Sequence, residues 1–352
     1  MTTTEKHGVA APSPQKAIKA TVTVTEPSSP YSIDSSNPAT PTPHIQPAPP
    51  EPCHTPPPRL DFADISNKVY SLAQKNSQLG EQTKVAIEVI EKAIQTYGLG
   101  SISISFNGGK DCTVLLHIYA AVLWKFCVEH PQNGHVQNGL NSSLHPPSSA
   151  RSNIHSPANL STSSHHDGSW EWFPTIPAIY ITYPNPFPEV ELFVQKCCYL
   201  YGLHLERISG DMKRALQHYL DTYRATFYPN ISDQAQEIKA ILVGTRRNDP
   251  RAGNLQHFDP TDPGWPEFMR VHPIIDWSYR DIWDFLLQLN VEYCVVYDKG
   301  YTSLGSSNNT HQNPDLRNPA LEGGFDPAYK LRDETHERSG RVSKPKGPEG
   351  SN

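Results

Sequence analysis

One stretch of the chain has residue types that suggest phosphate chemistry, the segment SFNGGKDC at residues 105–112. Its members are Ser105, Phe106, Asn107, Gly108, Gly109, Lys110, Asp111 and Cys112. Adjacent glycines let backbone N–H groups approach a phosphate closely, and Lys110 at a helix N-terminus adds positive charge. The segment is not a Walker A loop, which needs four residues between its glycines and a hydroxyl after the lysine. A Gly-Gly turn that only joins a strand to a helix is the alternative interpretation.

A second polar loop, VGTRRNDP at residues 243–250, follows a β-branched run. Ligands of open parallel sheets bind beyond the carboxyl ends of the strands, so both loops would open at the same edge. Beside Gly244, the side chains of Arg246, Arg247 and Arg251 could hold a polyphosphate. Asp249 is placed to hold a hydrated Mg²⁺. The alternative is a solvated loop, because these residue types are ordinary at protein surfaces.

A third segment, TDPGWPEFMR at residues 261–270, combines aromatic rings and a thioether with a carboxylate and a guanidinium. A flat heteroaromatic ligand could stack on Trp265 while Asp262 accepts hydrogen bonds from ring N–H groups and Arg270 meets a phosphate. Aromatic residues near a turn also commonly fill a core. The local pattern leaves both interpretations open.

Secondary-structure elements that could position these loops follow from hydrophobic periodicity. Helices are expected over residues 64–77, 81–96, 111–128, 187–201 and 211–223, and strands over 101–106, 176–182, 203–208 and 239–244. Residues 272–289 predict a short extended piece and then a helix, with Ser278 and Asp281 at capping-box spacing. Strands that alternate with helices predict a three-layer α/β/α fold with a mostly parallel sheet.

Composition divides the 352 residues into one domain and three polar segments. Residues 1–58 are rich in Pro, Ser and Thr, and residues 130–168 in Asn, Ser and His, without apolar periodicity. Such segments bury too little apolar surface to offset their ordering entropy. We therefore expect a disordered leader (1–58), a domain over 59–341 with a disordered insertion (130–168), and a disordered tail (342–352).

Bulk properties exclude several classes of protein. A formal net charge of −6 provides no global basic field for nucleic-acid binding. No run approaches 18 apolar residues, and the N-terminus lacks the apolar region of a signal peptide, so we expect no membrane span. The six cysteines show no paired spacing, and adjacent Cys197 and Cys198 fit buried free thiols. A reducing, cytoplasmic location is expected.

Five segments in order carry a family resemblance: SFNGGKDC, VGTRRNDP, TDPGWPEFMRVHPIIDWSYRDIW, YCVVYDKGYTSLG and ERSGR. Together they resemble the eukaryotic FAD synthases, FMN adenylyltransferases of the PAPS reductase-like fold. The resemblance runs from about Ser101 to Arg341, and the chain size is similar to the fungal single-domain type. The leader and the insertion have no clear counterpart in the family.

The resemblance implies roles for particular residues. Asn107, Asp111 and Asp249 match catalytic positions, and Asp111 and Asp249 would also hold magnesium. Arg338 and Arg341 match arginines of a C-terminal segment that covers the phosphates. Positions implied to bind ATP are Ser105, Phe106, Gly108, Gly109, Lys110, Tyr180, Ile181, Gly244, Arg246 and Arg247. Positions implied to bind the flavin are Asp262, Pro263, Gly264, Trp265, Met269 and Arg270.

The implied reaction is FMN plus MgATP giving FAD plus pyrophosphate. A monomer that acts on small molecules, without nucleic-acid or membrane partners, is expected, with FAD available for transfer to apo-flavoproteins. One alternative is a PAPS reductase, which needs a nucleophilic thiol on a C-terminal segment, but no cysteine follows Cys294. A second alternative is a catalytically silent flavin- or nucleotide-binding module whose Pro-rich segments recruit partners.

Overall fold

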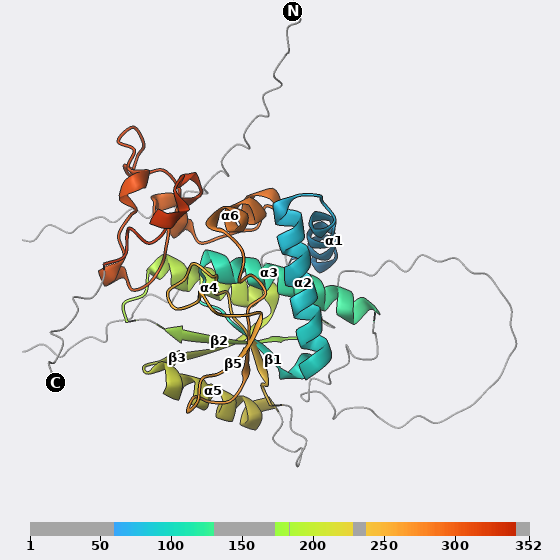
Figure 1. Cartoon of the computed structure of the whole chain (residues 1–352). Helices are drawn as coiled ribbons and strands as arrows, with labels where there is room; N and C mark the ends of the chain where they lie inside the picture. Colours follow the sequence, from blue (N-terminus) through green and yellow to red (C-terminus); the bar gives the residue numbers. More distant parts are fainter. Residues whose placement is uncertain (1–59, 130–172, 183, 228–236, 343–352) are drawn as a thin grey trace, which may run out of the picture. The chain divides into compact units, whose positions relative to one another are not determined.

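The computed structural model describes residues 60–129, 173–182, 184–227 and 237–342. The expected leader, the insertion and all of the expected tail except Val342 lie outside the described residues. The described part forms one three-layer domain around a single sheet (Figure 1).

The sheet has six strands in the described residues, and five of them run in one direction. They are β1 (Ile102–Ser105), β2 (Ile176–Thr182), β3 (Leu203–Ser209), β4 (Ala240–Leu242), β5 (Phe258–Pro260) and β6 (Met269–Val271). The order is β3-β2-β1-β4-β6-β5, and only β5 pairs antiparallel with its neighbour. From β1 the strands β2 and β3 extend the sheet toward one edge, whereas β4, β6 and β5 extend it toward the other. This reversal places a topological switch point between β1 and β4, at the centre of the sheet.

One face of the sheet carries most of the helices and the main core (Figure 1). These helices are α1 (Phe62–Ala73), α2 (Gln78–Tyr97), α3 (Lys110–Glu129), α4 (Pro188–Tyr201) and α6 (Tyr279–Gln288). The central helix α3 is apolar and long enough to cross a membrane by composition alone, but it is mostly buried against α1, α2 and α6. Its composition is that of a core helix.

The opposite face is covered by α5 (Met212–Phe227) (Figure 1). Ile179 and Ile241 of the sheet pack there against Tyr219 and Tyr223 of α5 in a second, smaller core. The Tyr219 hydroxyl lies 2.7 Å from the Ser103 hydroxyl, so this polar pair is satisfied inside the packing. The predicted coverage of both faces is confirmed, and the two layers differ greatly in size.

Most predicted elements are confirmed within a few residues. The strand predicted over 176–182 has the same bounds in the structure, and Ser278 and Asp281 form the predicted capping box at the start of α6. The extended piece predicted after His272 is wrong, because residues 273–276 form turns. The extended segment lies just before it, as β6. Strands β5 and β6, of three residues each, were not predicted, because their segments contain Pro and charged residues and no apolar run.

The chain after α6 has no long helix or strand within the described residues. Residues 290–342 instead contain short 3₁₀ turns, among them Val295–Lys299 and Glu334–His336. The fully buried Asn313 ties this region together, because its amide donates to the Thr302 hydroxyl at 3.0 Å and to the His336 carbonyl at 2.8 Å. This polar scaffold carries the last segment of the domain back to the edge of the sheet.

Candidate active site

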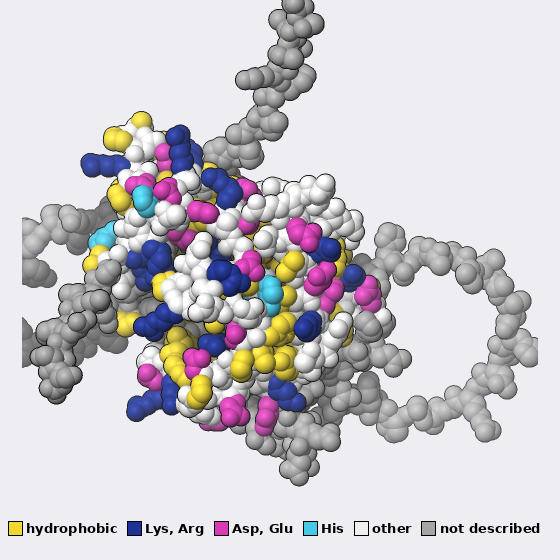
Figure 2. Space-filling view, viewed as in Figure 1, with side chains coloured by type: hydrophobic (Ala, Val, Ile, Leu, Met, Phe, Trp, Pro, Cys, Tyr) yellow, Lys and Arg dark blue, Asp and Glu magenta, His cyan; other side chains and the backbone are white. Residues whose placement is uncertain are grey.

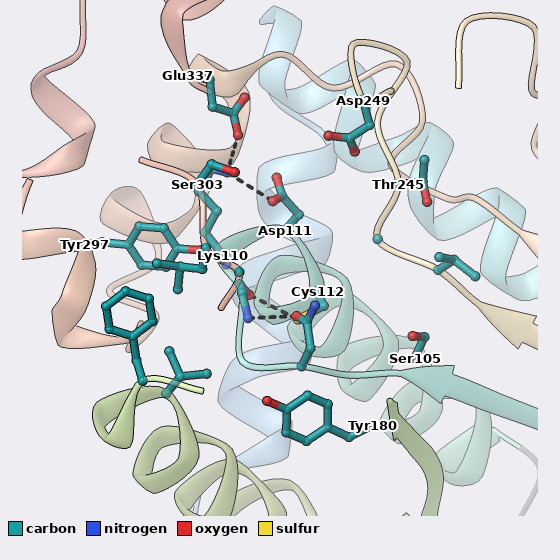
Figure 3. A pocket seen from close by; sticks show the side chains of 18 of the residues that line it. Ser105, Lys110, Asp111, Cys112, Tyr180, Thr245, Asp249, Tyr297, Ser303 and Glu337 are labelled. Atoms are coloured by element: carbon teal, nitrogen blue, oxygen red, sulfur yellow. Dashed lines mark hydrogen bonds and ion pairs between the residues drawn. The ribbon is translucent and has the colours of Figure 1, made fainter. Parts of the chain in front are cut away.

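A cavity of about 300 Å³ opens where β1 and β4 end, at the topological switch point. We call it the charged cavity; Figure 3 shows it from close by. Its lining comes from the loop after β1, the loop after β4, β2, and the C-terminal region. The lining includes Ser105, Asn107, Gly109, Lys110, Asp111, Cys112, Tyr180, Gly244, Thr245, Asp249, Tyr297, Leu304, Gly305, Glu337 and Arg338.

The loop after β1 is held in a fixed shape by its own side chains. The Asn107 carboxamide oxygen accepts a hydrogen bond from the Gly109 N–H at 3.0 Å. Gly108 has φ of +73°, and a Cβ there would lie 2.8 Å from a methyl of Val194, so only glycine fits. The Lys110 N–H donates to the Tyr297 hydroxyl at 2.8 Å. The Gly-Gly turn between β1 and α3 is thus present, and its Gly109 and Lys110 N–H groups have protein partners.

Four charged side chains form a closed ring at the base of the charged cavity, which we call the ion ring. Lys110 Nζ lies 3.0 Å from Asp111 and 2.6 Å from Glu337. The Arg246 guanidinium lies 2.7 Å from Asp111 and 2.6 Å from Glu337. Both cations are buried, at 2% and 1% exposure, so each needs a carboxylate partner. Figure 3 shows the Lys110 side chain between Asp111 and Glu337.

Two members of the ion ring, Asp111 and Arg246, have shifted pKa values. Burial alone would raise the pKa of the Asp111 carboxyl, but Arg246 and Lys110 outweigh burial and lower it. Burial likewise opposes the charge on Arg246, yet Asp111 and Glu337 raise its pKa well above the ordinary value. Both shifts favour the charged forms of Asp111 and Arg246, and the ring pairs two carboxylates with two cations.

Asp249 lies beside the ion ring but is not part of it. One of its carboxylate oxygens accepts a hydrogen bond from the Arg246 N–H at 2.9 Å. Burial raises the pKa of Asp249, and the neighbouring carboxylates Asp111 and Glu337 raise it further. Arg246 lowers this pKa in part, but the group of charges holds three carboxylates and only two cations.

This imbalance bears on the expected magnesium. Among the residues that the structure describes, no three His, Cys, Asp or Glu side chains gather as a metal site. Both Asp111 oxygens are already in contact with Lys110 and Arg246. Asp249 fits better, because a divalent cation would relieve the like charges around it. Mg²⁺ typically takes one or two carboxylates and completes its shell with phosphates and water.

Five of the positions expected to bind ATP do not line the charged cavity: Phe106, Gly108, Ile181, Arg246 and Arg247. The Arg247 guanidinium instead lies 2.5 Å from Asp276 and donates to the Gly253 and Leu255 carbonyls. Phe106 is fully buried in the main core. Geometry therefore gives no support to a role for the Arg247 or Phe106 side chain at the phosphates.

Both arginines of the C-terminal segment lie near the mouth of the charged cavity. Arg338 is exposed and lines it. The Arg341 guanidinium donates to the Leu304 carbonyl and lies over Gly305, both of which line the cavity. The segment is thus folded over the site, as the resemblance implies.

A second cavity of about 300 Å³ lies on the α5 side and shares Ser105, Asn107 and Val243 with the first. We call it the apolar cavity. Figure 2 shows hydrophobic side chains gathered in the region of α5 and β5. The other lining residues are Ile179, Ile181, Met212, Leu216, Ile241, Thr261, Asp262, Trp265, Phe268 and Arg270. At 37% exposure, Trp265 stands at this cavity rather than within the core.

Arg270 and Asp262 are held together at the apolar cavity. One Arg270 nitrogen donates to the Pro260 carbonyl at 2.8 Å and lies 3.5 Å from Asp262. Of the other residues expected at the flavin, Gly264 lines a neighbouring polar groove beside Trp265, while Pro263 and Met269 do not line the apolar cavity. The expected flavin segment is thus only partly brought together.

Two neighbouring residues of β2 line different cavities. Tyr180 lines the charged cavity and Ile181 the apolar one, because successive strand side chains point to opposite faces. The two residues therefore cannot line one ATP pocket with their side chains, although both were expected to.

Sequence reasoning missed three contributors. Glu337 closes the ion ring, and Met212 and Leu216 of α5 line the apolar cavity. The segment ERSGR contained a signal for Glu337, since its glutamate directly precedes Arg338. For Met212 and Leu216, the four-residue spacing on a helix placed them on one face, but nothing local indicated a cavity there.

Comparison with known proteins first defines the class. The phosphoadenosine phosphosulfate reductase domain matches residues 101–312, and the sheet and its edge site agree with a domain of this class. Within that class the chain belongs to the FAD synthase family. A probable FAD synthase of Schizosaccharomyces pombe is 35% identical over 80% of this chain and 87% of its own length.

Solved structures agree with this assignment. Yeast FAD synthetase in complex with FAD is similar with a TM-score of 0.57 and 25% identity, over 80% of this chain and 98% of that one. Candida glabrata FMN adenylyltransferase, solved with FMN and an ATP analogue, has a TM-score of 0.58 and 22% identity, over 80% and 96%. The latter likeness concerns the fold.

Proposed function

We propose that this protein is an FAD synthase that transfers AMP from ATP to the phosphate of FMN. One observation carries the proposal beyond family membership. A charged cavity and an apolar cavity meet at the carboxyl ends of β1 and β4 and share three lining residues. A reaction that joins a triphosphate to a flavin phosphate needs two such sites side by side.

The chemistry demands little covalent participation by the protein. A phosphate oxygen of FMN bonds to the α-phosphorus of ATP, the bond from that phosphorus to the bridging oxygen breaks, and pyrophosphate leaves with the bonding electrons. The FMN phosphate is already an anion near neutral pH, so no general base is required. Catalysis then rests on positioning two anions and neutralising their repulsion.

The described residues suit this task. Asn107 and the first residues of α3 line the charged cavity, and the positive N-terminal end of this helix would favour phosphate oxygens there. Arg338 adds an exposed positive charge at the mouth, and Lys110 forms part of the wall through the ion ring. Trp265, Ile181 and Met212 would contact the flavin ring in the apolar cavity.

We also propose that Mg²⁺ takes part, held by Asp249 and by the substrate phosphates. The unbalanced charge of Asp249 beside Asp111 and Glu337 supports this assignment. When bound, Mg²⁺ would neutralise developing charge on the phosphate oxygens. Asp249 would bind Mg²⁺ from the loop after β4, while the hydrogen bond from the Arg246 N–H holds the Asp249 carboxylate in place.

The two alternatives to this function lose support. The PAPS reductase interpretation needs a reactive thiol near the cavity on the C-terminal segment. Cys294 precedes that segment, is buried, and has a pKa raised to about 11 by burial. A silent module has no need for Asn107, Asp249 and Arg338 gathered around one cavity. That arrangement favours an active enzyme.

Assembly and location are also proposals. We propose a cytoplasmic monomer that releases FAD to apo-flavoproteins. The free cysteines of the described residues agree with a reducing compartment, because all five are unpaired. Size-exclusion chromatography with light scattering tests the monomer, and dimers at micromolar concentration would contradict it.

The decisive experiment for the function incubates the full chain with FMN, ATP and Mg²⁺. FAD formation, followed by flavin fluorescence quenching and chromatography, is expected together with one pyrophosphate per FAD. Omitting Mg²⁺ and adding EDTA should abolish turnover. Binding of both ligands without FAD would favour the silent module instead.

A further inference from the structure

Glu337 is the member of the ion ring that comes from the C-terminal segment, whereas Lys110, Asp111 and Arg246 come from the two loops at the sheet edge. One of its carboxylate oxygens lies 2.6 Å from Lys110 Nζ and 2.7 Å from an Arg246 nitrogen, and the other lies 2.6 Å from the same Arg246 nitrogen. One carboxylate thus joins two buried cations.

The backbone around Glu337 is fixed as firmly as its side chain. Its carbonyl accepts a hydrogen bond from the Thr302 hydroxyl at 2.6 Å, and its N–H donates to the Glu334 carbonyl at 3.1 Å. Asn313 donates to the His336 carbonyl just before it. These contacts hold Glu337 in the ion ring, so we expect it to remain there when a phosphate binds.

The next residue is Arg338, an exposed side chain that lines the charged cavity. A long, exposed arginine has many rotamers and gains little direction from its own surroundings. Its position over the cavity therefore depends on the backbone from which it projects. That backbone is anchored through Glu337 to the floor of the site.

We propose that Glu337 is a positioning residue that fixes Arg338 over the substrate phosphates by bridging Lys110 and Arg246. This inference rests on the proposed function, because FAD formation is its readout. It differs from a purely stabilising role, because the effect of Glu337 on turnover passes through Arg338. It also differs from an autoinhibitory role, in which removal of Glu337 would tighten ATP binding.

The test is a double-mutant cycle of Glu337→Gln and Arg338→Ala in the full chain. We expect the Arg338 variant to lose about 100-fold in kcat/KM and the Glu337 variant about 30-fold. The double variant should lose about 100-fold rather than the multiplied ~3,000-fold, because residues that act through one another are not additive. Multiplied losses would overturn the proposal, as would tighter ATP binding by Glu337→Gln.

Two further variants separate geometry from charge and from folding. Glu337→Asp keeps the charge but shortens the reach by one methylene, so we expect nearly the loss of Glu337→Gln; full activity would contradict positioning. If Glu337→Gln does not fold, Thr302→Val replaces it, with an expected loss of about fivefold that disappears in the Arg338→Ala background. A loss that persists there would overturn the proposal.

The matched control is Glu322→Gln, an exposed glutamate of the same C-terminal region. It changes the net charge equally and should leave kcat/KM unchanged in both backgrounds. Wild-type protein is assayed alongside. If the wild type makes no FAD, the proposed function fails; if it does and the losses multiply, only the role of Glu337 fails.

Discussion

The charged cavity and the apolar cavity are neighbours of similar volume, yet the side chains that line them differ in character. The charged cavity places two buried cations and two carboxylates in a neutral ring, with Asp249 beside it. The apolar cavity presents Ile, Leu and Met side chains with Trp265, and its charged residues Asp262 and Arg270 are already close to each other. The charged cavity thus offers an arrangement of charges to a ligand, whereas the apolar cavity offers apolar contact area.

This difference explains why the cations named from the sequence are not all available to a substrate. A buried lysine or arginine needs a carboxylate partner. Lys110 and Arg246 are therefore paired within the ion ring and are not free to bind a substrate anion. In the proposed function, phosphate binding would rest on the positive N-terminal end of α3, on Arg338 and on a divalent cation. The apolar cavity needs no such arrangement, because burial of a flat ring is favourable by itself.

Breaking the ion ring should have the largest effect on stability. Asp111→Asn leaves Lys110 and Arg246 with one shared carboxylate, and we expect the free energy of unfolding to fall by about 3 kcal/mol at pH 7. Urea denaturation measures it, with the exposed pair variant Asp64→Asn as control. The folded-state pKa of Asp111 is lowered, so its contribution is present above the unfolded value of 3.8 and is lost as pH falls through the lower folded value. A loss no larger than that of the control would mean that the ring does not hold the loops.

Removing Asp249 should damage turnover more than binding or stability. Asp249→Ala is expected to lower kcat by about 100- to 1,000-fold while the Kd for ATP without metal changes little. Steady-state assays and titrations over a range of Mg²⁺ concentrations measure it. The control is Asp276→Ala, an exposed carboxylate that pairs with Arg247 outside the cavity. Wild-type kcat in the Asp249 variant would remove this residue from the mechanism.

Truncating the exposed indole should affect only the apolar cavity. Trp265→Ala is expected to weaken FMN binding by about 10- to 100-fold and ATP binding by less than about twofold, because the indole supplies contact area to a ring. Flavin fluorescence titration and calorimetry measure the two affinities. Leu192→Ala, at a helix position that is 65% exposed, is the control. If ATP binding weakens instead, the two cavities exchange their substrates.

The smallest expected effect on activity comes from replacing Arg247, the neighbour of Arg246. Arg247→Ala should change kcat/KM by less than about twofold, because its guanidinium lies on Asp276 and two loop carbonyls outside the charged cavity. Assays under saturating FMN and varied ATP measure it. A rise of tenfold or more in KM for ATP would show that Arg247 moves to the phosphates.

The fold and the strand-end loops were predictable because their signals are local. Glycines, a β-branched run and apolar helical spacing set β1, α3 and the loop between them, and parallel strands bring their carboxyl ends to one edge. The choice between Arg246 and Arg247 was not predictable, because adjacent arginines have the same chemistry and only the backbone decides which one turns inward. Glu337 could not be paired with Lys110 from sequence, since the contact spans most of the domain.

The ion ring also has a consequence for how the protein is made. The last strand of the sheet ends at Val271, but the ring closes only with Glu337, which leaves the ribosome much later. At a synthesis rate of about 5–20 residues per second, the delay is several seconds. During that time the sheet can assemble while Lys110 and Arg246 still share a single carboxylate. The catalytic edge would thus be the part of the domain completed last in the life of each new chain.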